Sequence, residues 1–536
     1  MHNQVPEKPA SEEQVESVDH DNSSEDLSGR ARLAQAYAAN DATLSFWQTI
    51  KLYHRSILWT LYGQLVVFGY GIDGVIAAFL LGIPRFRQDF GEAFVVDGVP
   101  AYIISANWIA IFSGVSQLTA ILGAVMTGYL ADRLGRKITN AIFCAISIAA
   151  VGAQVAARGS LPILCVGKGL NGFSIGAWLV IGPLYASEIA PLKLRGWLTA
   201  VTNTIQFSGV LLFTGVIYVM GPMDSADAYQ IPFMLQWIIP SFVLLTIYFW
   251  PESPVYLVNT AKRDKAIQSL QALHGSNSRI DQEGILAQIE ETLDHEKSAS
   301  TANATASYAE CFNRHNRSRT LISMWIYACQ YLGGLVFVLG YQSYYYQLIG
   351  FGAKKSFFLT MLNNSFQFIA NILSWFLISA LGRRPLIVWG ELCGTICLFI
   401  IGGCSLIGTN PGYLATVSFM FVWAFTYQLT LGTVAWTVVA EIPSLRLRAK
   451  TQGLANLTLC FFQWAVAFVF PYMFNPDAGN LGGKVGFVFG ATSLLGFLGV
   501  FWFLPETKNR TADQLDKLYA REVPARKFHK TVLSDD

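Results

Sequence analysis

Three short segments of this chain occur twice, about 250 residues apart. The segment GYLADRLGRK, Gly128 to Lys137, returns in reduced form as SALGRRP, Ser379 to Pro385. The other two repeats pair Glu188 and Arg195 with Glu441 and Arg448, and PESP (Pro251 to Pro254) with PETK (Pro505 to Lys508). Independent matches at nearly the same offset indicate a duplicated chain, so we expect a fold made of two related halves.

Apolar runs that are long enough to cross a bilayer, which takes about 20 helical residues, fill both halves. The chain is 53% hydrophobic and 13% charged, a balance that excludes an ordinary soluble protein. The runs are 57–79, 107–131, 138–157, 161–184, 198–219 and 230–250, and then 321–343, 356–381, 385–406, 413–439, 453–474 and 485–504. We therefore predict an all-α membrane protein with 12 transmembrane helices in two six-helix halves, an arrangement typical of transporters.

Polar segments divide the chain into its predicted parts. These are a disordered cytosolic tail at 1–50, the N-terminal half at 51–250, a cytosolic helical linker at 251–320, the C-terminal half at 321–504 and a second cytosolic tail at 505–536. In the linker, apolar residues recur every three or four positions over 260–274 and 280–294, a helical period. We expect two short helices there that pack under the bundle, the alternative being a passive linker.

Lysines and arginines set the predicted orientation. If the N-terminus is inside, the short cytosolic loops hold more Lys and Arg than the loops on the opposite side. An even number of spans places both termini and the linker on one side, so we expect a multi-pass protein with both termini in the cytosol. The first 30 residues are polar and contain no apolar core of a cleavable signal peptide.

Composition and motifs exclude several functions. The net charge is +2, so nothing suggests a nucleic-acid partner. The 8 cysteines lack CxxC or Cys/His spacing and mostly lie in apolar runs, which indicates reduced packing residues rather than disulfides or a metal site. No HExxH or nucleophile motif is present, so we expect neither an enzyme nor a cofactor.

Several motifs are similar to those of one family. They are GYLADRLGRK, SEIAPLKLRG, PESP, the run from Gln330 to Tyr345, LGRRP, AWTVVAEIPSLRLRAK and PETKNRT. Over about residues 55–515 the chain resembles the sugar porter family of the major facilitator superfamily, and AEIPSLRLRAKT is most similar to its fungal maltose and general alpha-glucoside permeases. The resemblance implies a monomer in the lipid bilayer of the plasma membrane that imports a small neutral sugar together with a proton.

Charged residues at predicted cytosolic helix ends form one candidate site. Opposite charges there can pair when the cytosolic side is closed and separate when it opens. The resemblance gives this gate role to Asp132, Arg133, Arg136, Glu188, Arg195, Arg384, Glu441 and Arg448. The alternative is that basic residues only anchor the helix ends in the membrane, which we favour for Lys137, Lys193 and Arg446.

Recognition of a neutral sugar needs hydrogen-bonding side chains at mid-membrane and aromatic faces against the sugar ring. Polar side chains deep in apolar runs are candidates, because each costs free energy unless it finds a partner. By the resemblance, the substrate-binding residues are Gln330, Trp436, Asn203, Gln367, Gln428, Tyr331 and the outer-gate aromatic Tyr341. The alternative role for these side chains is hydrogen bonding between membrane helices.

Asp73 and Glu391 are the carboxylates that lie well inside predicted spans, and no histidine does. A carboxylate is therefore the candidate proton carrier. Asp73 and Lys168 fall about 10 Å below the outer surface by the 1.5 Å helical rise, so we expect them to meet. The resemblance implies that Asp73 carries the coupled proton with Lys168 as its charge partner; a purely structural ion pair is the alternative. Glu391 is expected near the cytosolic end of its helix, where solvent reaches it.

Two other functions fit the same fold. One is a sugar facilitator without proton coupling, and the other is a non-transporting sugar receptor. Receptors of this fold typically carry a long cytosolic signalling tail, and the stretch after the last predicted span, 505–536, is short.

Overall fold

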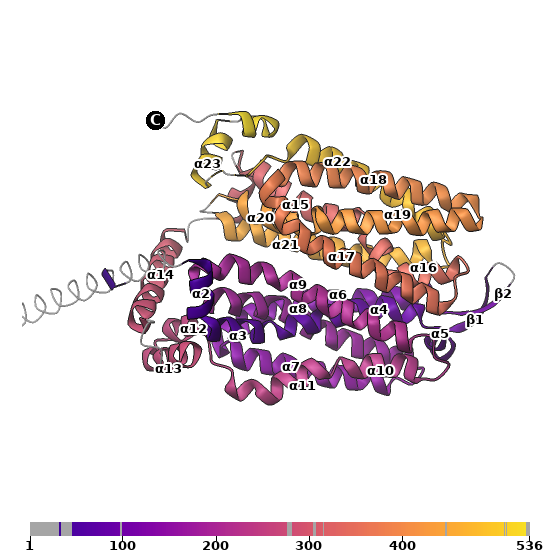
Figure 1. The fold of residues 1–536 in the computed structure, drawn as a ribbon, viewed down its shortest axis with the longest axis horizontal. Coiled ribbons are helices and arrows are strands. Elements are labelled where there is room, and N and C mark those ends of the chain that lie inside the picture. Colours follow the sequence, from indigo (N-terminus) through magenta and orange to yellow (C-terminus); the bar gives the residue numbers. More distant parts are fainter. Residues whose placement is uncertain are drawn as a thin grey trace, which may run out of the picture.

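The computed structural model describes residues 32–33, 45–96, 99–275, 281–303, 307–314, 316–444, 447–508, 510, 512–521 and 523–531. In this part of the chain, long helices form two bundles that lie side by side (Figure 1). The N-terminal half runs from indigo to magenta and the C-terminal half from orange to yellow. The predicted all-α membrane fold of twelve crossings in two halves is confirmed.

The N-terminal half begins with the short helix α2 (Phe46–Leu52), which lies partly within the segment predicted to be a tail. Its crossings are α3 (His54–Gly63) with α4 (Leu65–Gly82), α6 (Ala106–Leu134), α7 (Arg136–Ala156), α8 (Leu161–Ile189), α9 (Leu192–Met220), and α10 (Asp227–Leu235) with α11 (Ile238–Thr246) and η1 (Ile247–Phe249). Between α4 and α6 lie α5 (Pro84–Phe90) and an antiparallel hairpin of β1 (Glu92–Val96) and β2 (Val99–Ile103), which the sequence did not predict.

The C-terminal half repeats this plan. Its crossings are α15 (Arg317–Leu332) with η3 (Val336–Gly340) and α16 (Gln342–Leu348), α17 (Ala353–Leu381), α18 (Arg383–Ile407), α19 (Asn410–Leu429) with α20 (Leu431–Glu441), α21 (Arg448–Phe474), and α22 (Val485–Phe503) after η5 (Gly482–Lys484). The turn η2 (Tyr308–Phe312) precedes this half, and α23 (Ala512–Ala520) and η6 (Ala525–Lys530) follow it.

Within the described residues, ten helices are long and apolar enough to cross a membrane by composition alone. The other two crossings are α15–α16 and α17. The first is broken after α15 by two glycines, of which Gly334 has a φ of +86°. The second buries a row of amide side chains, Asn363, Asn364, Gln367 and Asn371. Polar and interrupted helices inside a membrane bundle typically mark the ligand path.

The N-terminal half packs tightly because small residues let helices approach closely. A Cβ atom added at Gly176 would lie 1.8 Å from the carbonyl oxygen of Ala120, and one at Gly123 would lie 2.0 Å from that of Phe173. These contacts join α6 and α8 backbone to backbone, as in other membrane helix pairs with small residues at the crossing.

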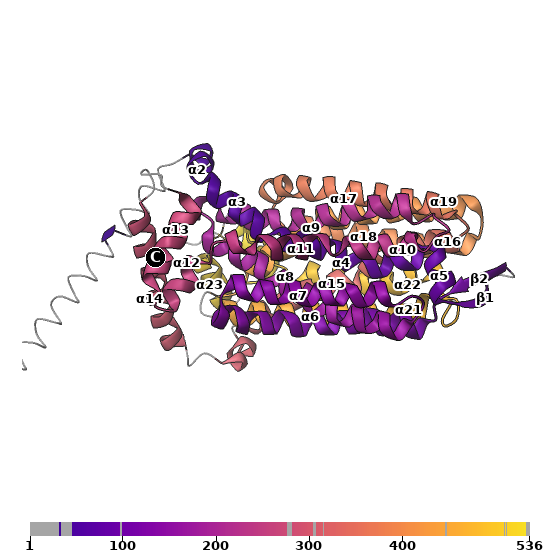
Figure 2. The ribbon, with the colours of Figure 1, turned by 90° about the horizontal axis from the view of Figure 1, so that it is seen from below.

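The linker forms helices at one end of the bundle. α12 (Pro254–Asn259), α13 (Arg263–His274) and α14 (Gln282–Asn303) lie at that end, and the β1–β2 hairpin lies at the opposite end (Figure 2). We call these the linker end and the hairpin end. The two predicted linker helices are confirmed as α13 and α14, and the apolar faces predicted for them pack together through Ala266, Leu270 and Leu286.

Candidate functional site

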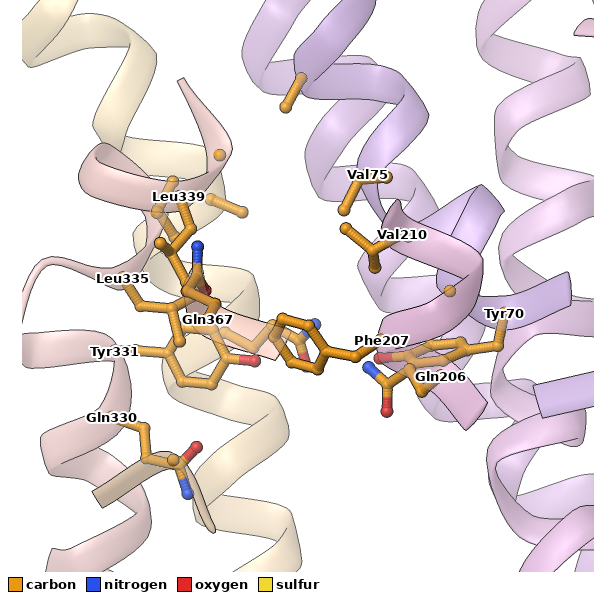
Figure 3. Close-up of a pocket in the computed structure, with 18 of the residues that line it drawn as sticks. Tyr70, Val75, Gln206, Phe207, Val210, Gln330, Tyr331, Leu335, Leu339 and Gln367 are labelled. Atoms are coloured by element: carbon orange, nitrogen blue, oxygen red, sulfur yellow. The ribbon is translucent and has the colours of Figure 1, made fainter. Parts of the chain in front are cut away.

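A cavity of about 310 Å³ lies between the two halves. All seven residues predicted to bind substrate line it: Asn203, Gln330, Tyr331, Tyr341, Gln367, Gln428 and Trp436. Figure 3 shows Tyr70, Gln206 and Phe207 of the N-terminal half opposite Gln330, Tyr331 and Gln367 of the C-terminal half. The volume is at the lower end of the range for small-molecule sites, and the lining combines aromatic rings with amides.

Two of these amides keep hydrogen-bonding groups without a protein partner. Gln330 accepts a hydrogen bond at Oε1 from the Tyr427 hydroxyl at 3.1 Å, while its Nε2 has no partner among the described residues. Gln367 donates from Nε2 to Asn364 at 3.2 Å, while its Oε1 has no partner among them either. Since both side chains are buried, a ligand that supplies the missing partners would gain binding energy.

Cross-half contacts close the cavity toward the hairpin end. The Gln347 side chain accepts a hydrogen bond from Arg87 at 2.7 Å and donates to the carbonyl of Gly82, so it joins α16 to α4 and α5. Asn475 likewise donates to the carbonyl of Ile104 at 2.8 Å. Tyr341 is buried beneath these contacts against Phe470, with ring centroids 4.6 Å apart, and therefore forms part of the closure.

The cavity opens toward the linker end. Trp436, which lies on α20 near its linker-end terminus at Glu441, lines the cavity yet is 45% exposed. Tyr341 and Phe79, on the hairpin side of the same cavity, are 5% and 2% exposed. A solute could therefore enter or leave the cavity of this conformation from the linker end.

The cavity is also lined by polar residues that the sequence did not predict to bind substrate. Gln117, Gln206, Asn364, Tyr427 and Gln463 also line the cavity. Each is a polar residue within a predicted apolar run, the same signal that drew attention to Gln330. The family positions alone could not identify them, because these side chains fall outside the motifs.

The structure brings Asp73 and Lys168 together. Both are buried and line a cavity of about 110 Å³ between α4, α6 and α8, where they interact electrostatically. Asp73 Oδ1 has no hydrogen-bond partner among the described residues. Tyr70, Ser113, Gln117 and Gln463 line both this pocket and the larger cavity, so the charged pair lies directly beside the proposed sugar site.

Glu391 lies elsewhere than expected. The sequence predicted a solvated side chain, but Glu391 is 5% exposed and packs between α15, α19 and α22. The reason is that α18 begins at Arg383, so Glu391 lies about 12 Å along the helix axis and faces the core of the C-terminal half.

The repeated basic turns have the same geometry in both halves. Gly135 and Gly382 have φ values of +89° and +95°, and each precedes the first residue of a helix, α7 or α18. The Glu252 carboxylate accepts hydrogen bonds from the backbone amides of Arg136 and Lys137 at 2.9 and 3.1 Å. A negative charge at a helix N-terminus is favourable, which explains why PESP recurs with the turn.

In the C-terminal half, Glu506 takes the place of Glu252. It accepts hydrogen bonds from the backbone amides of Arg383 and Arg384, both at 3.1 Å. The PETK segment therefore caps α18 just as PESP caps α7.

The first residue after each turn, Arg136 or Arg383, forms an ion pair. Arg136 donates two hydrogen bonds to Glu188, the one from Nε measuring 2.9 Å. In the C-terminal half, Arg383 and not the predicted Arg384 pairs with Glu441, at 2.8 Å. Arg384 instead donates to the carbonyls of Phe501 and Leu504 and caps α22, because it follows Arg383 by one residue and points to another side of α18.

The remaining gate candidates make weaker contacts. Asp132 is 74% exposed and lies 3.8 Å from Arg136, and the Arg133 guanidinium covers the Tyr129 ring at 4.3 Å. Arg448 Nε has no hydrogen-bond partner among the described residues. The side chain of Arg195 lies outside the described part of the structure.

Two related six-helix halves around a polar central cavity are the fold of the major facilitator superfamily. The chain belongs to the sugar (and other) transporter family, whose model matches residues 57–519. The resemblance found in the sequence is thus confirmed, and the family consists of transporters rather than enzymes, as predicted.

Relatives of known name cover most of the chain. The general alpha-glucoside permease of Saccharomyces cerevisiae is 28% identical over 502 residues, 92% of this chain and 80% of that protein. The alpha-glucosides permease MPH3 of the same yeast is 31% identical over 488 residues, 90% and 80% of the two chains. The MFS transporter fmqE of Aspergillus fumigatus is 29% identical over 532 residues, 96% and 97% of the two chains.

Solved structures share the fold. The inward open conformation of the xylose transporter XylE from Escherichia coli superposes with a TM-score of 0.69 at 21% identity, covering 86% of this chain and 98% of that one. A structure of a D-xylose-proton symporter superposes with a TM-score of 0.63 at 20% identity, covering 86% and 100%.

Proposed function

We propose that the protein is a plasma-membrane importer that takes up an alpha-glucoside such as maltose together with a proton. The observation that carries this proposal is the cavity between the halves, which is lined by amides and aromatic rings of both halves and adjoins the Asp73–Lys168 pocket. A neutral sugar needs hydrogen-bond donors, acceptors and ring faces rather than a charged partner. The alpha-glucoside permeases among the relatives support this substrate class.

Transport would follow alternating access between two conformations. We propose that the linker end faces the cytosol, with both termini on that side. The conformation described above is then open to the cytosol and closed to the outside by Gln347, Asn475 and the buried tyrosines. An impermeant thiol reagent tests the orientation in intact cells: cysteines introduced at His20, Ser300 or Lys530 should stay unlabelled, and labelling of any of them would reverse it.

The gate role proposed for the linker end rests on the two ion pairs. Each pair joins helices within one half, Arg136 with Glu188 and Arg383 with Glu441. The sequence predicted that such pairs separate when this end opens, whereas both are formed while it is open, so we propose that they hold the helix ends in place in this conformation. On closure, the Glu188 and Glu441 carboxylates would each find a cationic partner in the other half. Arg448 and Arg195, which the repeat places at equivalent positions, are the proposed partners of these two carboxylates.

Asp73 is proposed to carry the coupled proton. While Lys168 is close, the carboxylate can stay ionised; substrate that separates the pair leaves a buried charge, which proton uptake relieves. A membrane potential of 100 mV supplies about 2.3 kcal/mol per proton, enough to accumulate a neutral sugar about fifty-fold. The cavity is complete within one chain, so a monomer suffices.

Uptake tests the proposal. Cells that lack their own sugar permeases would express the protein and receive labelled mono- and disaccharides at two external pH values. Maltose uptake that is faster at the lower pH is the expected result. Equal uptake at both pH values would indicate an uncoupled facilitator, and binding without uptake of any sugar would indicate a receptor.

A further inference from the structure

Glu391 is a buried carboxylate that the proposed mechanism does not use. Its Oε2 accepts a hydrogen bond from Ser493 on α22 at 3.3 Å, and its Oε1 has no partner among the described residues. The hydroxyl groups of Ser493 and Thr395 lie 2.7 Å apart, which places both beside the Oε2 side of the carboxylate. One oxygen is thus satisfied, and the other is available to bind a proton.

Glu391 borders a small void of about 20 Å³. This is enough for one water molecule, and the lining includes Tyr427, Trp423, Thr430 and Ser493. The titratable groups that face Glu391 are Cys329 on α15 and Tyr427 on α19, whereas α20 and α22 contribute Thr430, Leu431, Ser493 and Gly496. Among the described residues that line the void, none is a lysine or arginine.

Tyr427 joins this void to the substrate cavity. Its side chain lines both, and its hydroxyl donates to Gln330 at 3.1 Å. The Trp423 ring stacks on Tyr427 with a 3° angle between planes and a centroid distance of 5.1 Å, which fixes the tyrosine ring. The Tyr427 hydroxyl can both donate and accept hydrogen bonds. When Gln330 changes its partner, Tyr427 can therefore change its own hydrogen bonding and so alter the surroundings of Glu391.

We propose that Glu391 is a second proton-binding site, located in the C-terminal half and linked to the substrate cavity through Tyr427 and Gln330. A hydronium ion that enters from the cavity transfers its proton to Oε1, which leaves a neutral carboxylic acid and a water molecule. Burial without a cationic partner favours this neutral form, because an isolated buried carboxylate is costly. The link to sugar rests on the proposed function, whereas the proton site itself does not.

Infrared difference spectroscopy of the purified full-length protein between about pH 5 and about pH 9 tests the site, because a carboxyl group that titrates changes its C=O band over that interval. The wild type should show a band from Glu391 that Glu391→Gln removes. Asp73→Asn is the matched control: it should remove a different band and leave that of Glu391. An identical spectrum for Glu391→Gln and the wild type would overturn the proposal, as would a Glu391 band that does not change with pH.

Two further variants test the linkage and guard against poor insertion. Ser493→Ala removes the hydrogen bond to Oε2 and should shift the Glu391 band. This variant keeps the test available if Glu391→Gln does not reach the membrane. An unshifted band would contradict the assignment. Maltose added at constant pH should perturb the Glu391 band in the wild type but not in Tyr427→Phe. If maltose perturbs only the Asp73 band, the link to the cavity is wrong while sugar transport stands.

Discussion

The Arg383 Nη2 atom lies 2.8 Å from Glu441 Oε1, and this pair repeats in the C-terminal half the contact of Arg136 with Glu188. The two pairs differ in burial. Arg136 and Glu188 are 8% and 9% exposed, whereas Arg383 and Glu441 are 18% and 28% exposed. The same sequence repeat therefore produces one buried ion pair and one that water reaches.

This difference predicts unequal costs of mutation. Arg136→Ala leaves Glu188 buried without its cation, at a cost of about 3–5 kcal/mol, whereas Arg383→Ala should cost about 1 kcal/mol because solvent screens Glu441. Thermal unfolding of the purified variants gives the comparison. Both variants should slow transport more than they weaken sugar binding. Arg384→Ala is the control, since it leaves no carboxylate unpaired; equal melting temperatures for Arg136→Ala and Arg384→Ala would contradict the account.

The cavity predicts a second result. Gln330→Ala and Trp436→Ala should each weaken sugar binding by about 1–3 kcal/mol, through loss of a buried amide contact and an aromatic face. Isothermal titration of the purified protein measures the affinity. Gln64→Ala is the matched control, because Gln64 is a buried amide that donates to the carbonyl of Leu198 outside the cavity. Wild-type affinity in both cavity variants would rule out the assigned site.

The closure at the hairpin end predicts a shift in conformation. Gln347→Ala removes the hydrogen bonds to Arg87 and Gly82, worth about 1 kcal/mol each, so the outward-open population should rise by about tenfold or more. A cysteine placed at Ser113, which lines the cavity, reports this through its rate of labelling from outside. The Ser113→Cys protein with Gln347 intact is the reference. Equal labelling rates in the two proteins would show that Gln347 does not hold the closure.

His274 predicts a pH dependence at the linker end. The side chain is buried on α13 against Tyr53, and desolvation lowers its pKa to about 4. The unfolded state binds a proton to this histidine more readily than the folded state does. The contribution of His274 to the free energy of unfolding is therefore fully present above the ordinary histidine pKa. It is lost as the pH falls from about 6.5 toward 4, by about 3 kcal/mol at most. The hydrogen-exchange protection factor of α13, which is corrected for the slower intrinsic exchange at lower pH, should therefore fall between pH 7 and pH 5. His274→Phe should abolish that change, and an unaltered pH response in the variant would remove His274 as its cause.

Much of the fold could be predicted because hydrophobic runs have a direct physical meaning in a membrane. The twelve crossings follow from the length of the apolar runs, and the two linker helices follow from apolar periodicity. The β1–β2 hairpin could not be predicted, since its ten strand residues give too short a signal beside the long helices.

The site could be predicted in part. All seven sugar candidates line one cavity because polar residues inside apolar runs turn toward each other rather than toward lipid. The choice between Arg383 and Arg384 depends on a helix rotation of about 100° per residue, which a motif does not resolve. The burial of Glu391 likewise depends on which face of α18 meets α22.

Proteoliposomes that contain the purified protein test the central claim most directly. Labelled maltose is supplied outside under two conditions. In one, an imposed proton gradient makes the outside acidic; in the other, no gradient is imposed. The wild type should accumulate maltose only when the outside is acidic. Asp73→Asn should exchange maltose across the membrane without accumulating it. Accumulation by Asp73→Asn at the wild-type level, or no maltose transport by the wild type under either condition, would contradict it.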